Sequence, residues 1–223
     1  MTFSLIARCI KTGQFGIVIA SSSPAVAARC SHVRAGVGVV ASQNITDPAL
    51  GPLVLDQMSR GASSMAALAT ITQNRAHIDY RQLLAIGETG PPAVFSGPRV
   101  LGIWAEALGQ DCAAAGNLLV DPGVPAAMVA AFDHATGHLG DRLMAGLLAG
   151  FTAGGEAGPV RSAGLKISHR LDWPLVDLRQ DWSEAPVEAL HNAWAVYRPQ
   201  IEDYVQRAVD PSRARSYGVP GDT

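Results

Sequence analysis

The second residue of the chain, Thr2, carries the groups best suited to nucleophilic chemistry. A threonine hydroxyl attacks a carbonyl once a base takes its proton, and a free α-amine, with an ordinary pKa of about 7.7–8.0, suits that task. Met1 precedes Thr2, and threonine is small enough for a methionine before it to be trimmed. Loss of Met1 would place nucleophile and base on one residue. The alternative is that Thr2 is simply a β-forming residue where a strand begins.

Residues 1–22 predict a β-hairpin that would position Thr2. Residues 2–9 alternate in polarity with a period of two, and residues 15–20 form a β-branched apolar run beyond a turn that contains Gly13. If the hairpin is antiparallel about Thr12, Thr2 lies opposite Ser21 or Ser22. Two further hydroxyl groups are therefore expected near the α-amine.

The length of the chain, 223 residues, and its composition indicate a single domain. We predict this domain over residues 1–210 and a loose tail at 211–223. Hydrophobic residues make up 48% and aromatic residues 6%, which predicts a core of small side chains. The net charge of −2 argues against a nucleic-acid partner or an anionic membrane surface.

The three cysteines, at positions 9, 30 and 112, lack zinc-ligand spacing and fit a reducing compartment. No apolar run reaches the roughly 20 residues of a membrane-spanning helix, so a cytoplasmic protein is predicted. His134 and His138 have the spacing of metal ligands, but Gly137 lies between them at an expected helix end. We therefore predict neither a metal nor a cofactor.

The predicted elements occur in groups, which favours an α+β fold over a doubly wound parallel sheet. Two antiparallel sheets that face each other, each covered outside by helices, would use all of them. Beyond the hairpin, strands are expected at 35–42, 81–87, 93–97, 103–108, 112–118, 163–169 and 175–178, and helices at 52–60, 63–72, 122–135, 139–148 and 186–209, the last broken near Pro199.

A set of short motifs extends over nearly the whole chain, and their order and spacing matter more than any one of them. They are Met1-Thr2-Phe3-Ser4, Arg34 to Gly38 with Ser42-Gln43, Asp47-Pro48 with Gly51-Pro52, Gly116-Asn117-Leu118, Gly154-Gly155 before Ser162-Ala163, and Asp177-Leu178-Arg179 with Asp181, Pro186 and Glu188. With these residues the chain resembles the family called domain of unknown function 1028, which is grouped with the N-terminal nucleophile (Ntn) hydrolases. The resemblance implies a four-layer αββα sandwich with the nucleophile where the first strand begins.

The same resemblance implies catalytic roles for four residues. Thr2 would be the nucleophile and its α-amine the base, and Ser22 would be a polar group that supports them. Arg34 falls where many such enzymes hold a cation, which would disfavour protonation of the amine. Asn117 could donate an N–H to a tetrahedral oxyanion; the alternative is that it is a turn-side residue that caps a strand.

Three further residues are candidates for substrate binding. Gln43, at the end of an expected strand, would point into the same cleft or else pair with backbone. His32 would contact the substrate, and Arg29, like Arg34, would receive an anionic group of it.

The leading hypothesis is a cytoplasmic Ntn hydrolase that cleaves a small amide with Thr2 after Met1 is removed. The alternative is a non-catalytic ligand-binding or assembly protein that keeps the sandwich with Met1 uncleaved. The alanine-rich helices expected within 122–149 favour a homo-oligomer under either hypothesis.

Overall fold

The amino-terminal hairpin forms the centre of the larger of two sheets. The computed structural model describes residues 1–219, and β1 (Thr2–Cys9) pairs with β2 (Gln14–Ser21) in an antiparallel register that sets Phe3 opposite Ala20. Both strands are buried on both faces except at Cys9. The predicted hairpin is confirmed, and its alternate residues pack into two different cores.

Over residues 1–219 the strands form two antiparallel sheets. The larger has the strand order β10-β9-β2-β1-β8-β7 and the smaller the order β3-β4-β5-β6. The remaining strands are β3 (Ser31–Arg34), β4 (Gly38–Asn44), β5 (Arg81–Gly87), β6 (Ala93–Ser96), β7 (Ala105–Leu108), β8 (Cys112–Asn117), β9 (Ser162–Ser168) and β10 (Val176–Gln180).

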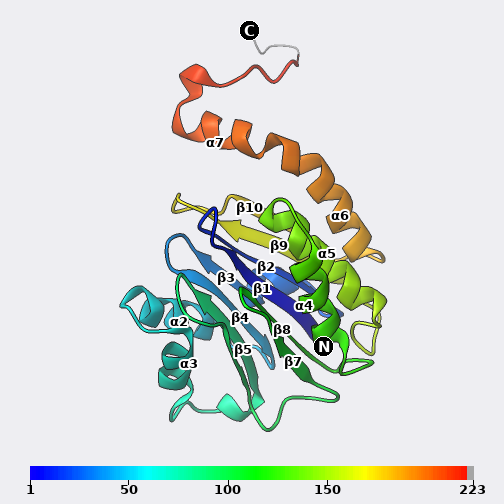
Figure 1. Ribbon diagram of the computed structural model, residues 1–223. Helices are drawn as coiled ribbons and strands as arrows, with labels where there is room; N and C mark the ends of the chain where they lie inside the picture. The colour runs from blue at the N-terminus through cyan, green and yellow to red at the C-terminus, as the bar shows by residue number, and fades with distance from the viewer. Residues whose placement is uncertain (220–223) are drawn as a thin grey trace.

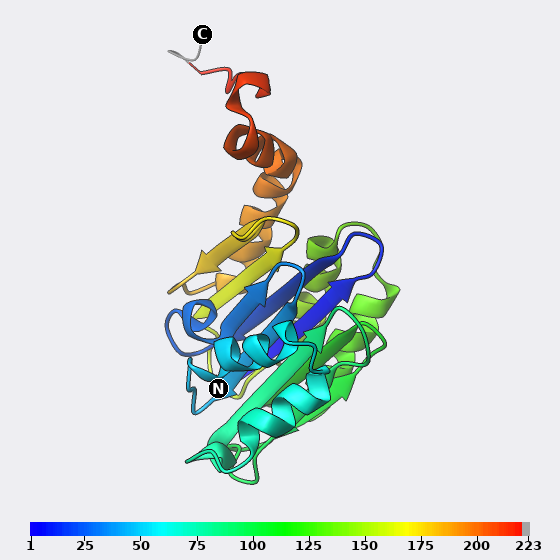
Figure 2. The same cartoon turned by 90° about the vertical axis from the view of Figure 1, so that its left-hand side faces the viewer.

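Helices cover the outer face of each sheet, as Figures 1 and 2 show. The smaller sheet is covered by α2 (Leu50–Ser59) and α3 (Ser64–Thr72), and the larger by α4 (Val124–His134), α5 (Leu139–Thr152) and α6 (Pro186–Tyr197). The fold is therefore the predicted α+β sandwich with four layers in the order αββα.

Small and β-branched side chains fill the space between the sheets. Ile6, Ile17 and Ile19 from the larger sheet meet Leu84 and Ile86 from the smaller one, and Ala113 and Ala115 of β8 complete this layer. Alanine along β8 lets the sheets approach closely. Toward the end of the sandwich where Thr2 lies, these apolar residues give way to buried polar ones.

The structure corrects two predicted elements. The strand expected at 35–42 begins only at Gly38, as β4, because residues 35–37 form a turn after β3 in which Gly36 has φ 66° and the Val37 amide donates to the Arg34 carbonyl at 3.2 Å. A positive φ is favourable for glycine, so this residue makes a turn instead of continuing a strand. Before this turn, where no element is predicted, the chain forms the short helix α1 (Val26–Cys30) and β3.

The last helix is interrupted where the sequence predicts it. α6 is followed by a 3₁₀ turn (Arg198–Gln200) that contains Pro199 and by α7 (Ile201–Val209). α7 extends beyond the sandwich at the end away from the amino terminus (Figures 1 and 2). Of the predicted tail at 211–223, positions 220–223 lie outside the described residues. None of the helices within residues 1–219 has both the length and the apolarity needed to cross a membrane.

Candidate functional site

The Thr2 hydroxyl lies between the Met1 carbonyl and a serine of the neighbouring strand. Its Oγ1 is 2.5 Å from the Met1 carbonyl oxygen and 3.4 Å from Ser21 Oγ. The Ser21 hydroxyl also donates to the Met1 carbonyl at 2.5 Å and accepts from the Ser23 amide at 3.0 Å. Two hydroxyl groups thus converge on the carbonyl that precedes Thr2, and Thr2 is 5% exposed.

On the other side of β1, Thr2 is paired with Asn117 at the end of β8. The Asn117 carboxamide Nδ2 donates to Gln82 Oε1 at 3.1 Å, and Gln43 Nε2 donates to the same oxygen at 2.8 Å. The Ser4 hydroxyl donates to Gln43 Oε1 at 2.7 Å. We call Ser4, Gln43, Gln82 and Asn117 the amide network; all four are fully buried.

Strand periodicity explains why these polar residues meet. Thr2 and Ser4 share the inner face of β1 with Ile6, and Asn117 shares the inner face of β8 with Ala115. On the smaller sheet, Gln43 and Gln82 are directly paired. Within residues 1–219, Asn117 Oδ1 is buried without a hydrogen-bond partner, which is unusual for a buried polar atom.

Glu156 brings a buried carboxylate to the amino terminus. It is 3% exposed and forms a bridge with Leu119 just beyond β8. Burial raises the pKa of Glu156 to about 7, although the Met1 ammonium group and polar groups of Ser22 act to lower it. Neither carboxylate oxygen has a hydrogen bond of regular geometry with any residue in the described part of the chain.

The raised pKa of Glu156 predicts a specific dependence of stability on pH. Between about pH 4.5 and 7 the folded state holds a proton on Glu156 that the unfolded state has released, so the free energy of unfolding should fall as pH rises through this range. Glu156→Gln should remove that slope and make the protein more stable than wild type by about 3 kcal/mol at pH 8. Urea unfolding at pH 5, 6, 7 and 8 measures this, with the exposed Glu88→Gln as control; identical slopes for Glu156→Gln and wild type would contradict it.

Three other predicted site residues lie at the Thr2 end of the sandwich. Asn117 and Gln43 belong to the amide network. Ser22 is half-buried and faces Glu156, whereas the hydroxyl that contacts Thr2 belongs to Ser21. The sequence predicted either Ser21 or Ser22 opposite Thr2. The pairing of β1 with β2, in which Phe3 is opposite Ala20, sets Ser21 opposite Thr2.

The structure does not bring Arg34 to Thr2. Arg34 Nη1 is paired with Asp56 at 2.8 Å, and Arg34 lines a cavity of about 490 Å³ together with Ser168 and Arg170. Ser168 ends β9, whose first residue, Ser162, is paired with Ser21. Because six strand residues span about 20 Å, Arg34 lies at the opposite end of the sandwich from Thr2.

Arg29 and His32 also point elsewhere. Arg29 is on the exposed side of α1, where its Nη2 donates to the Pro24 carbonyl at 3.0 Å. His32 packs against α2, since a Cβ on Gly51 would lie 2.1 Å from His32 Cδ2, and burial lowers the pKa of His32. The side chains of β3 alternate, so Val33 enters the space between the sheets and His32 faces the outer helix.

Three functional candidates were missed from the sequence. Ser4 and Gln82 could have been found from the period of two, because they continue the inner faces marked by Ile6 and by Leu84 and Ile86. Glu156 gave no such signal, because it follows two glycines in a segment that resembles a flexible loop. Its burial depends on contacts with strands far away in sequence.

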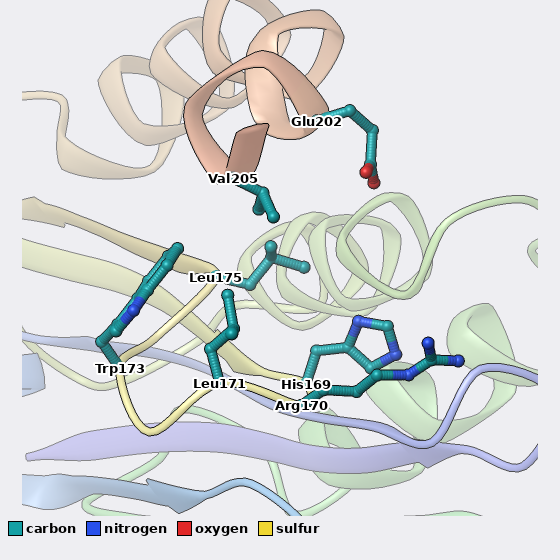
Figure 3. Close-up of a pocket in the computed structure, with 7 residues that line it drawn as sticks. All are labelled: His169, Arg170, Leu171, Trp173, Leu175, Glu202 and Val205. Atoms are coloured by element: carbon teal, nitrogen blue, oxygen red, sulfur yellow. The ribbon is translucent and has the colours of Figure 1, made fainter. Parts of the chain in front are cut away.

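A separate pocket lies at the other end of the molecule. It has a volume of about 220 Å³ and is lined by the connection between β9 and β10 and by α7. Figure 3 shows Leu175 and Val205 facing each other in it, and His169 Nε2 contacts the Thr12 carbonyl at 2.8 Å. Residues 1–219 contain no cluster of three or more His, Cys, Asp or Glu side chains able to hold a metal ion. The Thr2 end, where a hydroxyl group, buried carboxamides and a buried carboxylate lie together, is the better candidate site.

Comparisons with known proteins give a family and a fold. A family model described as "Family of unknown function (DUF1028)" matches residues 2–190. No curated protein matches the chain. The crystal structure of protein SPO2555 from Silicibacter pomeroyi, which carries the same family model, has a TM-score of 0.85 and 28% identity over 92% of this chain and 90% of that one. Anbu (ancestral beta-subunit) from Yersinia bercovieri has a TM-score of 0.39 and 13% identity over 92% of this chain and 97% of that one, a likeness too weak to argue from.

Proposed function

The chain belongs to the family of unknown function DUF1028, and from the geometry at Thr2 we propose that it is an N-terminal nucleophile hydrolase that cleaves a small amide after Met1 is removed. The observation that carries this proposal is the convergence of the Thr2 and Ser21 hydroxyl groups on one carbonyl oxygen, each at 2.5 Å. A carbonyl held there is within reach of the Thr2 oxygen.

The proposed reaction has two steps. The free α-amine of Thr2 takes the proton of the hydroxyl, the oxygen attacks the substrate carbonyl, and the C–N bond breaks as the amine returns the proton to the leaving nitrogen. Water then hydrolyses the threonyl ester with the same amine as base. Ser21 would orient the Thr2 hydroxyl. Asn117 has two N–H groups, of which one serves Gln82, and we assign the other to the oxyanion.

The experiment compares the chain with and without Met1. Protein that begins at Thr2 is treated with a β-lactone, an acylating probe that contains no amine, and the intact mass and peptide map are recorded. We expect one acyl adduct, located on Thr2, because both the hydroxyl and its base are then free. The matched control retains Met1 through an uncleaved extension and should take no adduct. Failure of the Thr2-first protein to form the adduct would contradict the proposed function.

One observation favours a second candidate, a non-catalytic binding protein that keeps Met1. Met1 covers Thr2, whose exposure is 5%, and a residue so covered cannot meet a substrate. Under this candidate, protein expressed without a tag should keep the mass of Met1 and bind ligands elsewhere. Intact mass of the untagged protein separates the two candidates.

A further inference from the structure

Met1 occupies its place much as the acyl part of a substrate would. Its carbonyl oxygen accepts from the Thr2 and Ser21 hydroxyl groups, and its carbonyl carbon is bonded to the Thr2 nitrogen, so a substrate carbonyl would lie near this place once that nitrogen is a free amine. Its ammonium group is near enough to Glu156 to act against the rise in pKa of that carboxyl group. Met1 therefore presents an acyl carbonyl and, one carbon away, a cation.

The pocket around Met1 is built from the loop that carries Glu156. Glycines keep this loop close to the amino terminus: a Cβ on Gly158 would lie 2.9 Å from Met1 Cε, and a Cβ on Gly155 would lie 3.2 Å from the Phe3 ring. The Ala157 amide fixes the loop by donating to the Leu118 carbonyl at 2.8 Å. Removal of Met1 would vacate space bordered by Gly158 and by the Glu156 carboxylate.

A cation bound beside Glu156 would stabilise its charged form, which burial alone disfavours. Over residues 1–219, both oxygens of Glu156 are buried without a hydrogen bond of regular geometry, although polar groups of Ser22 act on them, and an uncompensated buried charge is costly. The neighbourhood is acidic: a cavity of about 380 Å³ on the same loop is lined by Glu156, Glu184 and Glu188 together with apolar side chains such as Phe151 and Val187. Of these, Glu184 is paired with Arg161.

From these contacts we propose that the substrates are amides of α-amino acids with a free amino group, and that Glu156 binds their ammonium group while the acyl carbonyl lies at Thr2 and Ser21. This inference rests on the function proposed above and reverses the expectation of an anionic substrate. That expectation depended on Arg29 and Arg34, which lie elsewhere. An apolar side chain such as that of methionine would occupy the space that Met1 leaves against Gly158.

Binding can be tested without catalysis. Protein that lacks Met1 and carries Thr2→Ala is titrated by calorimetry at pH 8 with L-methioninamide and with N-acetyl-L-methioninamide, which has no ammonium group. We expect the free amine to bind at least about tenfold more tightly, since a charge-assisted hydrogen bond to a buried carboxylate is worth about 1.5–3 kcal/mol. Glu156→Gln should abolish this preference, and the exposed Glu88→Gln should retain it.

The outcomes separate this inference from the proposed function. Equal binding of the two amides, or a preference that survives Glu156→Gln, overturns the assignment. Equal binding is also expected if the α-amine of residue 2 itself pairs with the Glu156 carboxylate and keeps the ammonium group of the ligand out. The comparison of the two amides does not require the Glu156 variant, so it decides even if that variant misfolds. Acylation of Thr2 by the amine-free β-lactone reports on the nucleophile alone.

Discussion

Thr2→Ala is expected to slow acylation by the β-lactone at least about 10³-fold in protein that begins at residue 2. The substitution removes the attacking oxygen but leaves the α-amine, Ser21 and the amide network in place. Because Thr2 Oγ1 hydrogen-bonds only to the Met1 carbonyl and Ser21 within the described residues, the fold should tolerate its loss. The rate is measured from the growth of the adduct mass with time.

Two controls make this result specific. Thr2→Ser keeps the hydroxyl and the amine and should stay within about tenfold of wild type, because the same reaction remains possible. Thr12→Ala removes an exposed threonine hydroxyl at the far end of the same hairpin and should react as wild type does. Unchanged acylation of Thr2→Ala, or an adduct on Ser21 in the wild type, would show that Thr2 is not the nucleophile.

Most of the fold follows from local sequence patterns. The period of two in residues 2–9 places one set of side chains between the sheets and the other against α4 and α5, as the separate clusters that contain Ile6 and Leu5 show. Ser63 begins α3 by accepting the Ala66 amide at 3.2 Å, and Pro199 ends α6. Such signals act over a few residues, so the sequence alone carries them.

The arrangement of the site depends on contacts between residues far apart in sequence. For this reason the sequence placed some of the candidate site residues near Thr2 and misplaced or missed others. Asn117 and Gln43 were predicted near Thr2 and lie there because each extends an inner strand face. Arg34 ends β3, a strand that the sequence did not predict, and it lies at the other end of the sandwich from Thr2. Glu156 is buried through its contacts with the amino terminus and with Leu119, and no periodic pattern marks such contacts.

Gln82→Met is expected to lower the free energy of unfolding by about 4 kcal/mol, because Gln82 is the centre of the amide network. Its Oε1 accepts from Gln43 at 2.8 Å and from Asn117 at 3.1 Å, and its Nε2 donates to the Gly116 carbonyl at 3.3 Å and to Ser96 at 3.1 Å. Methionine has a similar volume but cannot replace these bonds, and each buried group left unpaired costs about 1–3 kcal/mol. Urea unfolding measures the loss.

The matched control is Gln110→Met, at an exposed position, which should change the free energy of unfolding by less than about 0.5 kcal/mol.

Gln82→Met also tests how Asn117 is held, because it removes the acceptor that orients the Asn117 carboxamide. If Asn117 stabilises the oxyanion, acylation of Thr2 should slow by about 10²-fold in the Gln82 variant under conditions where it remains folded. Destabilisation with an unchanged acylation rate would confine the amide network to a structural role, and an unchanged unfolding free energy would show that its hydrogen bonds contribute nothing to the fold.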